Sequence, residues 1–184
     1  MIVTALGGSV TKSVGRSSWR STAGKLTVHI MPSANLSEMN AMSTESNRSL
    51  VKRYYEEVFN RGDVGLIDQL AVADYDEHSP FPGQPNGIEG LKARTAGLLA
   101  AFKPVFILHE VVAEGDTVVV YWTNTGTHSG PFMGIPPTGR TVKISGVDIY
   151  RIRDGKMAEH WHVVEQLQML QQLGVIPSPE GATH

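Results

Sequence analysis

The pattern of hydrophobic and polar positions changes its period once along the chain, near residue 104. Before this point, apolar residues recur at the spacing of amphipathic helices. The pattern predicts a first helix over residues 47–60, a short second helix carrying Leu66, Ile67 and Leu70, and a third helix over residues 88–101. Residues 73–90 are predicted to be mainly loop, because three prolines in this stretch enforce extended backbone.

After residue 104 the pattern alternates with the period of β-strands. It predicts four strands, over residues 105–113, 117–127, 141–153 and 157–164, and a short final helix over residues 166–173. Successive strands joined by turns indicate an antiparallel meander. The fold class is therefore α+β, with three N-terminal helices packed on a curved four-stranded antiparallel sheet that encloses one pocket.

The last two strands contain the most informative residues. Alternation places Asp148 and Tyr150 on one face of their strand, and His160 and His162 on one face of the next. If Asp154-Gly155-Lys156 is a three-residue turn, Asp148 lies opposite His162 on the inward face, within contact distance. A two-residue turn would shift the register and separate them, so the pairing depends on the turn.

A carboxylate beside an imidazole fixes its tautomer and raises its pKa, which suits a proton shuttle near neutral pH. The alternative is a structural hydrogen bond with no catalytic role. His78, His160 and His162 also raise the question of a three-histidine metal site, but no HxxE or HExxH spacing supports one, and we expect no metal.

The long segment 127–140 between two predicted strands is either a lid, with His128 and Phe132 contacting a ligand, or a plain connection. Its glycines match no phosphate-binding motif. His78, where a helix passes into a loop, is either a hydrogen-bond donor in the pocket or an ordinary loop residue.

Three aromatic residues complete the set of substrate-binding candidates. Trp122 lies on a predicted strand, where it serves either the core or the ligand. Tyr54 and Tyr55 are neighbours on the first predicted helix, so at least one of them faces inward.

Composition excludes several classes of function. The 184-residue chain is 41% hydrophobic and 18% charged, with a net charge of −2, which gives no reason to expect nucleic acid or an anionic membrane as partner. No cysteine is present, which excludes thiolate nucleophiles and thiolate metal ligands. No segment is apolar for long enough to span a bilayer, and we expect a cytoplasmic protein.

The N-terminal 45 residues differ from the rest in composition. Up to Leu36 they carry basic residues and no acidic one, with many Ser, Thr and Gly. This segment is either a disordered extension upstream of a natural start near Met42 or a targeting or accessory segment. We expect an ordered domain over residues 46–174 and a flexible tail over residues 175–184.

A set of short motifs in the ordered part resembles the SnoaL-like polyketide cyclases, also called ester cyclases. The motifs, in chain order, are Asp76-Glu77-His78 with Pro80, Gly87-Ile88-Glu89-Gly90, His128-Ser129-Gly130-Pro131-Phe132 with Gly134, Pro137-Thr138-Gly139-Arg140, Asp148 with Arg151, Asp154-Gly155-Lys156 and Glu159-His160-Trp161. The resemblance covers about residues 47–174. It implies the cone-shaped fold of the superfamily that includes ketosteroid isomerase and limonene-epoxide hydrolase.

The resemblance also implies a cofactor-free reaction, in which a pocket acid/base removes an α-proton and the enolate closes a ring by aldol condensation. His162 matches the position of the family's acid/base Asp, and Asp148 matches a pocket His, so the two residue types are exchanged here. His78 matches a substrate-binding amide or imidazole position. The strand around Trp122 lacks the Arg and Asp that limonene-epoxide hydrolase uses, which disfavours epoxide hydrolysis.

Two hypotheses of function follow. The first is a cofactor-independent cyclase, isomerase or lyase that acts on a small, largely apolar carbonyl compound. His162 would be the general acid/base, Asp148 would orient it, and His78, His160 and a tyrosine of the first helix would be the polar, substrate-binding groups of the pocket. The second is a non-catalytic protein of the same fold that binds a small molecule. Under both, we expect a homodimer formed through the outer sheet face that bears Ile149 and Trp161.

Overall fold

The computed structural model describes residues 11–12, 19–20 and 36–178. The chain divides into two compact units, Met1–Met39 and Asn40–His184. In the first unit, two short strands, β1 (Thr11–Lys12) and β2 (Trp19–Arg20), pair antiparallel. The second unit contains every candidate site residue.

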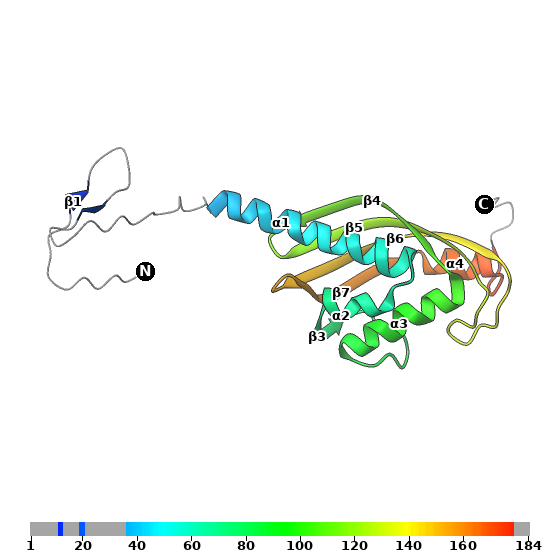
Figure 1. Ribbon diagram of the computed structural model, residues 1–184. Helices are drawn as coiled ribbons and strands as arrows, with labels where there is room; N and C mark the ends of the chain where they lie inside the picture. The colour runs from blue at the N-terminus through cyan, green and yellow to red at the C-terminus, as the bar shows by residue number, and fades with distance from the viewer. Residues whose placement is uncertain (1–10, 13–18, 21–35, 179–184) are drawn as a thin grey trace. The chain divides into compact units, whose positions relative to one another are not determined.

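Helices fill the first half of the second unit (Figure 1). They are α1 (Leu36–Arg53), which continues into a π-helix (Tyr54–Asn60), a 3-10 turn (Val64–Leu66) that leads into α2 (Ile67–Leu70), and α3 (Gly87–Phe102). The Asp63 side chain accepts a hydrogen bond from the Leu66 amide and so caps the 3-10 turn. The three predicted helical segments are therefore present.

The first helix begins earlier than the sequence pattern indicated. Residues 1–10, 13–18 and 21–35 of the expected disordered extension lie outside the described residues, as does the end of the expected tail, 179–184. The last part of that extension, from Leu36 onward, is helical and forms the start of α1. Its polar composition lacks the apolar stripe that marked the helix from residue 47 onward.

The sheet has five strands and is mixed, which corrects the predicted four-stranded antiparallel sheet. Its order is β3-β7-β6-β5-β4, with β3 parallel to β7 and all other neighbours antiparallel. The strands are β3 (Ala71–Glu77), β4 (Val105–Glu114), β5 (Thr117–Thr127), β6 (Thr141–Arg153) and β7 (Lys156–Val164), and a final helix, α4 (Gln166–Leu173), follows.

Strand β3 was not predicted from the sequence, which expected mainly loop over residues 73–90, and the reasons are physical. It is an edge strand with three acidic residues, which are poor strand formers, and prolines follow it directly. Its partner β7 is parallel and far away in sequence, so no hairpin turn marks the pairing. The helices α1, α2 and α3 lie on one face of this sheet (Figure 1), and the core lies between the two layers.

None of the described helices is long and apolar enough to cross a membrane.

Two glycines of α3 provide a matched test of this packing. A Cβ on Gly90 would lie 1.8 Å from the carbonyl oxygen of Pro85, whereas a Cβ on exposed Gly97 would meet nothing within 4 Å. Gly90→Ala should lower the free energy of unfolding by about 1–3 kcal/mol, since the backbone of residue 85 must move. Gly97→Ala should raise it by roughly 0.5–1 kcal/mol through helix propensity. Urea denaturation of both variants measures this; equal effects would contradict the close packing of α3 on the 82–86 loop.

Candidate active site

The register between β6 and β7 places Asp148 opposite His162, as the sequence predicted, but by a different route. Arg153 pairs with Lys156, so the turn consists of two residues, Asp154 and Gly155, both with positive φ. That turn alone would separate the pair. A β-bulge at Ala158 restores the register, because one extra residue of β7 is left unpaired between Met157 and Glu159.

The side chain of Asp148 nevertheless contacts other groups than His162. The Tyr55 hydroxyl donates a hydrogen bond to Oδ2 of Asp148, and the Tyr150 hydroxyl lies 3.4 Å from the same oxygen. Oδ1 of Asp148 lies 3.6 Å from Nε2 of His160, an ion-pair distance. Among the described hydrogen bonds and ion pairs, none joins Asp148 to His162. The carboxylate therefore orients His160.

His160 is buried between two carboxylates. Its Nδ1 lies 2.8 Å from Oε2 of Glu77, on the side away from Asp148. Burial alone would lower the pKa of His160, but attraction to Asp148 and Glu77 outweighs burial and raises it. Burial would likewise raise the pKa of Asp148, but His160 and the Tyr55 hydroxyl lower it. His160 and Asp148 therefore form a buried ion pair.

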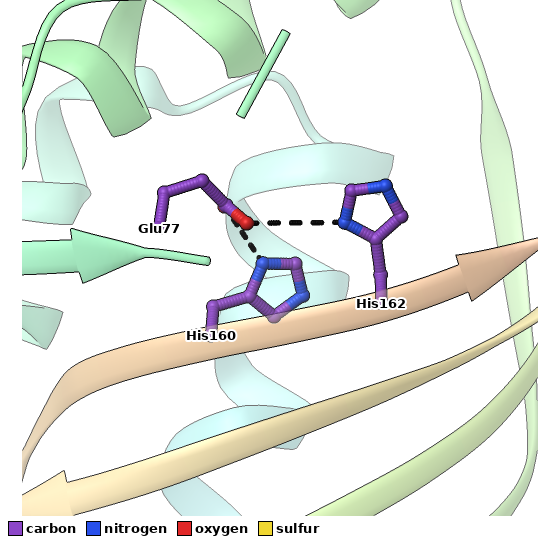
Figure 2. Close-up of side chains that lie close together, drawn as sticks. All are labelled: Glu77, His160 and His162. Atoms are coloured by element: carbon purple, nitrogen blue, oxygen red, sulfur yellow. Dashed lines mark hydrogen bonds and ion pairs between the residues drawn. The ribbon is translucent and has the colours of Figure 1, made fainter. Parts of the chain in front are cut away.

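Glu77, at the end of β3, contacts four other groups, and Figure 2 shows two of them, His160 and His162. Besides His160, its carboxylate lies 3.4 Å from Nη1 of Arg94 and 3.8 Å from Nδ1 of His162, and it accepts a hydrogen bond from the Ser79 amide. Only 6% of the Glu77 side chain is exposed. Burial would raise its pKa, but His160 and Arg94 lower it, so the carboxylate is ionised.

His162 lies beside a guanidinium group. Nη2 of Arg94 is 3.2 Å from Nδ1 and 3.5 Å from Nε2 of the imidazole. Burial, followed by the positive charges of Arg94 and His160, lowers the pKa of His162 to about 4. The sequence-based expectation of a raised pKa is wrong: Asp148 and Glu77 do raise the pKa of His162, but burial and the positive charges of Arg94 and His160 outweigh them.

These polar groups lie on the wall of a cavity of about 340 Å³. Six of the predicted site residues line it: Tyr54, Trp122, Phe132, Asp148, His160 and His162. The rest of the wall is mainly apolar and aromatic, with contributions from Phe59, Phe81, Leu91, Leu98, Phe106, Met133, Ile144, Val164 and Met169. The arrangement is an apolar chamber with one charged side.

Three predicted substrate-binding residues lie outside the lining of this cavity. Tyr55 is buried behind it, as the hydrogen-bond donor to Asp148. His78 stacks on Trp161 at 4.0 Å and contacts Glu159, because alternation along β3 directs Glu77 and not His78 inward. His128 is fully buried against Phe102 and lies 3.1 Å from Thr138.

Sequence reasoning missed Glu77 and Arg94, although signals for both were present. Tyr75 and Glu77 are two residues apart, which places the carboxylate on the same buried face as Tyr75 once β3 is recognised. Arg94 falls between Leu91 and Leu98 at helical spacing, a charge within an apolar stripe. A charge at such a position indicates a buried partner.

Glu77, His160 and His162 have potential ligand atoms within 4.8 Å of one another. Arg94, however, already places a positive charge next to both Glu77 and His162. A divalent cation there would face strong repulsion. We therefore interpret the three residues as an ion-pair network and assign no metal to them; the absence of a metal remains a prediction.

The lowered pKa of His162 makes stability depend on pH. The unfolded chain takes up a proton on this residue near pH ~6.5, whereas the folded protein resists it until about pH 4. The free energy of unfolding should therefore fall as pH decreases from 6.5 to 4, by at most about 3 kcal/mol from this residue, whose side chain is 12% exposed. In His162→Gln this contribution is missing. A stability difference between wild type and variant that is constant over this range would contradict the assignment.

Comparisons with known proteins agree with the fold and with the motifs. A family model described as SnoaL-like polyketide cyclase matches residues 49–173. The aklanonic acid methyl ester cyclase DnrD of Streptomyces peucetius is 31% identical over 148 residues, covering 76% of this chain and 98% of that protein. The nogalonic acid methyl ester cyclase of Streptomyces nogalater is 30% identical over 119 residues, covering 63% of this chain and 89% of that protein.

Solved structures with the same fold are also similar to this chain. TsrD from Streptomyces laurentii superimposes with a TM-score of 0.66 at 31% identity, covering 72% of this chain and 97% of that chain. A SnoaL-like polyketide cyclase from Jannaschia sp. CCS1 superimposes with a TM-score of 0.65 at 27% identity, covering 73% and 95% of the two chains. The resemblance seen in the sequence motifs is confirmed, and this chain belongs to the SnoaL-like polyketide cyclase family.

Proposed function

We propose that the protein catalyses a cofactor-independent, ring-closing acid/base reaction on a small, apolar carbonyl compound bound in the cavity. The relatives are named as cyclases of aklanonic and nogalonic acid methyl esters, and the family as polyketide cyclases, so the methyl ester of a polyketide acid is the substrate class we propose. The apolar and aromatic walls suit such a molecule, and the charged side of the chamber supplies the groups for proton transfer.

The observation that carries this proposal is an unprotonated imidazole on the cavity wall. Because its pKa is lowered to about 4, His162 is unprotonated at neutral pH, and it becomes a strong enough base only when the positive charge of Arg94 beside it is offset. Asp148 also lines the cavity, but Tyr55 and His160 stabilise its charged form and make it the weaker acceptor. His162 is therefore the general base, and Asp148 acts on it indirectly, by holding His160 in place.

The reaction conserves atoms and charge. His162 removes a proton from the carbon next to a substrate carbonyl, and an enolate forms. The enolate carbon attacks a second carbonyl carbon of the same molecule, which makes the new carbon–carbon bond and leaves an alkoxide. The proton on His162 then passes to the alkoxide, so that the product is a cyclic alcohol with the mass of the substrate.

A non-catalytic ligand-binding protein is the competing proposal. The pocket alone would serve it equally well. The two differ in what happens to a bound ester, because binding without turnover leaves the substrate unchanged.

Purified protein incubated with aklanonic and nogalonic acid methyl esters should give cyclised products of unchanged mass, separable by chromatography. His162→Gln should lower kcat by roughly 10²–10⁴-fold, the usual contribution of a general base. The matched control is His109→Gln, which removes an exposed imidazole that contacts Thr123 on the neighbouring strand. Undiminished turnover by His162→Gln, or tight binding of both esters without turnover by the wild type, would contradict the catalytic proposal.

The outer face of the sheet supports the proposed homodimer. Ile149, Tyr121 and Val163 on this face are 37%, 43% and 75% exposed, which is unusual for large apolar side chains that lie close together. The dimer and the cytoplasmic location remain proposals, both compatible with a small-molecule substrate.

A further inference from the structure

Arg94 is the one side chain with a permanent positive charge that lines the cavity in the described part of the chain. Several contacts fix its position. Its guanidinium carbon lies 4.2 Å from the centre of the Phe81 ring, and Nη1 donates to the Ser79 carbonyl at 3.1 Å and approaches Glu77. The side chain is 11% exposed. A cation held this firmly costs no reorganisation when charge develops near it.

The guanidinium of Arg94 lies within hydrogen-bond distance of the His162 imidazole. The two ring nitrogens point in different directions, so one N–H cannot donate properly to both. The similar distances from Nη2, 3.2 and 3.5 Å, therefore place the guanidinium beside the ring. A positive charge in this place opposes a second one on His162.

We propose that Arg94 binds the developing enolate oxygen of the substrate. Its guanidinium thereby links the two charges that proton abstraction creates, the negative enolate oxygen and the positive imidazolium of His162. This inference rests on the proposed function. In the resting site, Arg94 repels a proton from His162. When the enolate oxygen lies against Arg94, its negative charge offsets that of the guanidinium, and the imidazolium is no longer repelled. The interaction is thus stronger in the transition state than in the ground state, which is the condition for catalysis.

Three hydroxyl and imidazole groups on the wall are already engaged with other residues. Tyr54 is engaged with Thr95 at 3.1 Å, and burial raises its pKa. Tyr150 is engaged with Tyr55. The nitrogens of His160 face Glu77 and Asp148. Arg94 is the cation that remains next to the base.

The charges that face His162 come from every element around it. They are Arg94 on α3, Glu77 on β3, Asp148 on β6 and His160 on β7. The carboxylate of Glu77 compensates Arg94, and Asp148 compensates His160, so the resting site is neutral. Substituting Arg94 leaves Glu77 as an excess negative charge. The double variant Arg94→Gln/Glu77→Gln removes both charges, so its comparison with Arg94→Gln separates the loss of the cation from the effect of an excess negative charge.

The test uses 4-nitrophenol, whose phenolate oxygen resembles an enolate and whose ionisation is visible by absorbance. Wild-type protein should bind the phenolate in preference to the neutral phenol. Arg94→Gln and the double variant should lose this preference on the order of 10²-fold, and Arg94→Lys should keep part of it. The control is Arg151→Gln, which removes a surface arginine paired with Asp116. An unchanged preference in both Gln variants would overturn the role of Arg94.

Steady-state kinetics separate this role from a merely structural one. In Arg94→Gln, kcat for the ester should fall with little change in KM, and the pKa of the base in the pH–rate profile should rise from about 4, while burial still holds it below its free value. A loss of activity without this change in pKa would assign Arg94 a structural role and overturn the inference. Failure of the proposed function is distinguishable, because the 4-nitrophenol titration needs no turnover.

Discussion

The ionised carboxylate of Glu77 is the interaction on which the rest of the site depends. It ends the parallel edge strand β3 and contacts His160 on β7 and Arg94 on α3, so it connects three elements that are far apart in sequence. A charge buried to this degree is stable only when it is fully paired. Removing either partner would leave the carboxylate only partly compensated, so the geometry of the charged side of the cavity depends on this one residue.

Because of this arrangement, two histidines on the same strand are in opposite states. His160 lies between two carboxylates and is charged, whereas His162 lies beside Arg94 and is neutral. The rings are 5.4 Å apart, so each charge also affects the other. One imidazole is used for structure and the other is left free for proton transfer. The difference in protonation between the two histidines arises from neighbouring residues on α3 and β3, not from β7, the strand that carries both.

The sequence predicted the elements that have a local pattern of hydrophobic and polar residues. Alternation and hairpin order were sufficient for β6 and β7, but the alignment of Asp148 with His162 also depends on a bulge at Ala158 that the sequence pattern did not indicate. The strand β3 was missed, because a parallel edge strand has no local signal, and with it the roles of Glu77 and Arg94 were missed. Those roles determine which imidazole the carboxylate of Asp148 contacts. Cross-strand alignment fixes which backbones lie opposite each other, but side-chain contacts are decided by the third element that packs on them.

Nitrogen NMR of ¹⁵N-labelled histidine measures the opposite protonation of the His160 and His162 imidazoles most directly. The His162→Gln variant assigns the signals. We predict that near pH 6 the ring nitrogens of His160 show the shifts of an imidazolium, while those of His162 show the shifts of a neutral ring and change only near pH 4. Two rings that titrate together near pH ~6.5 would contradict the account.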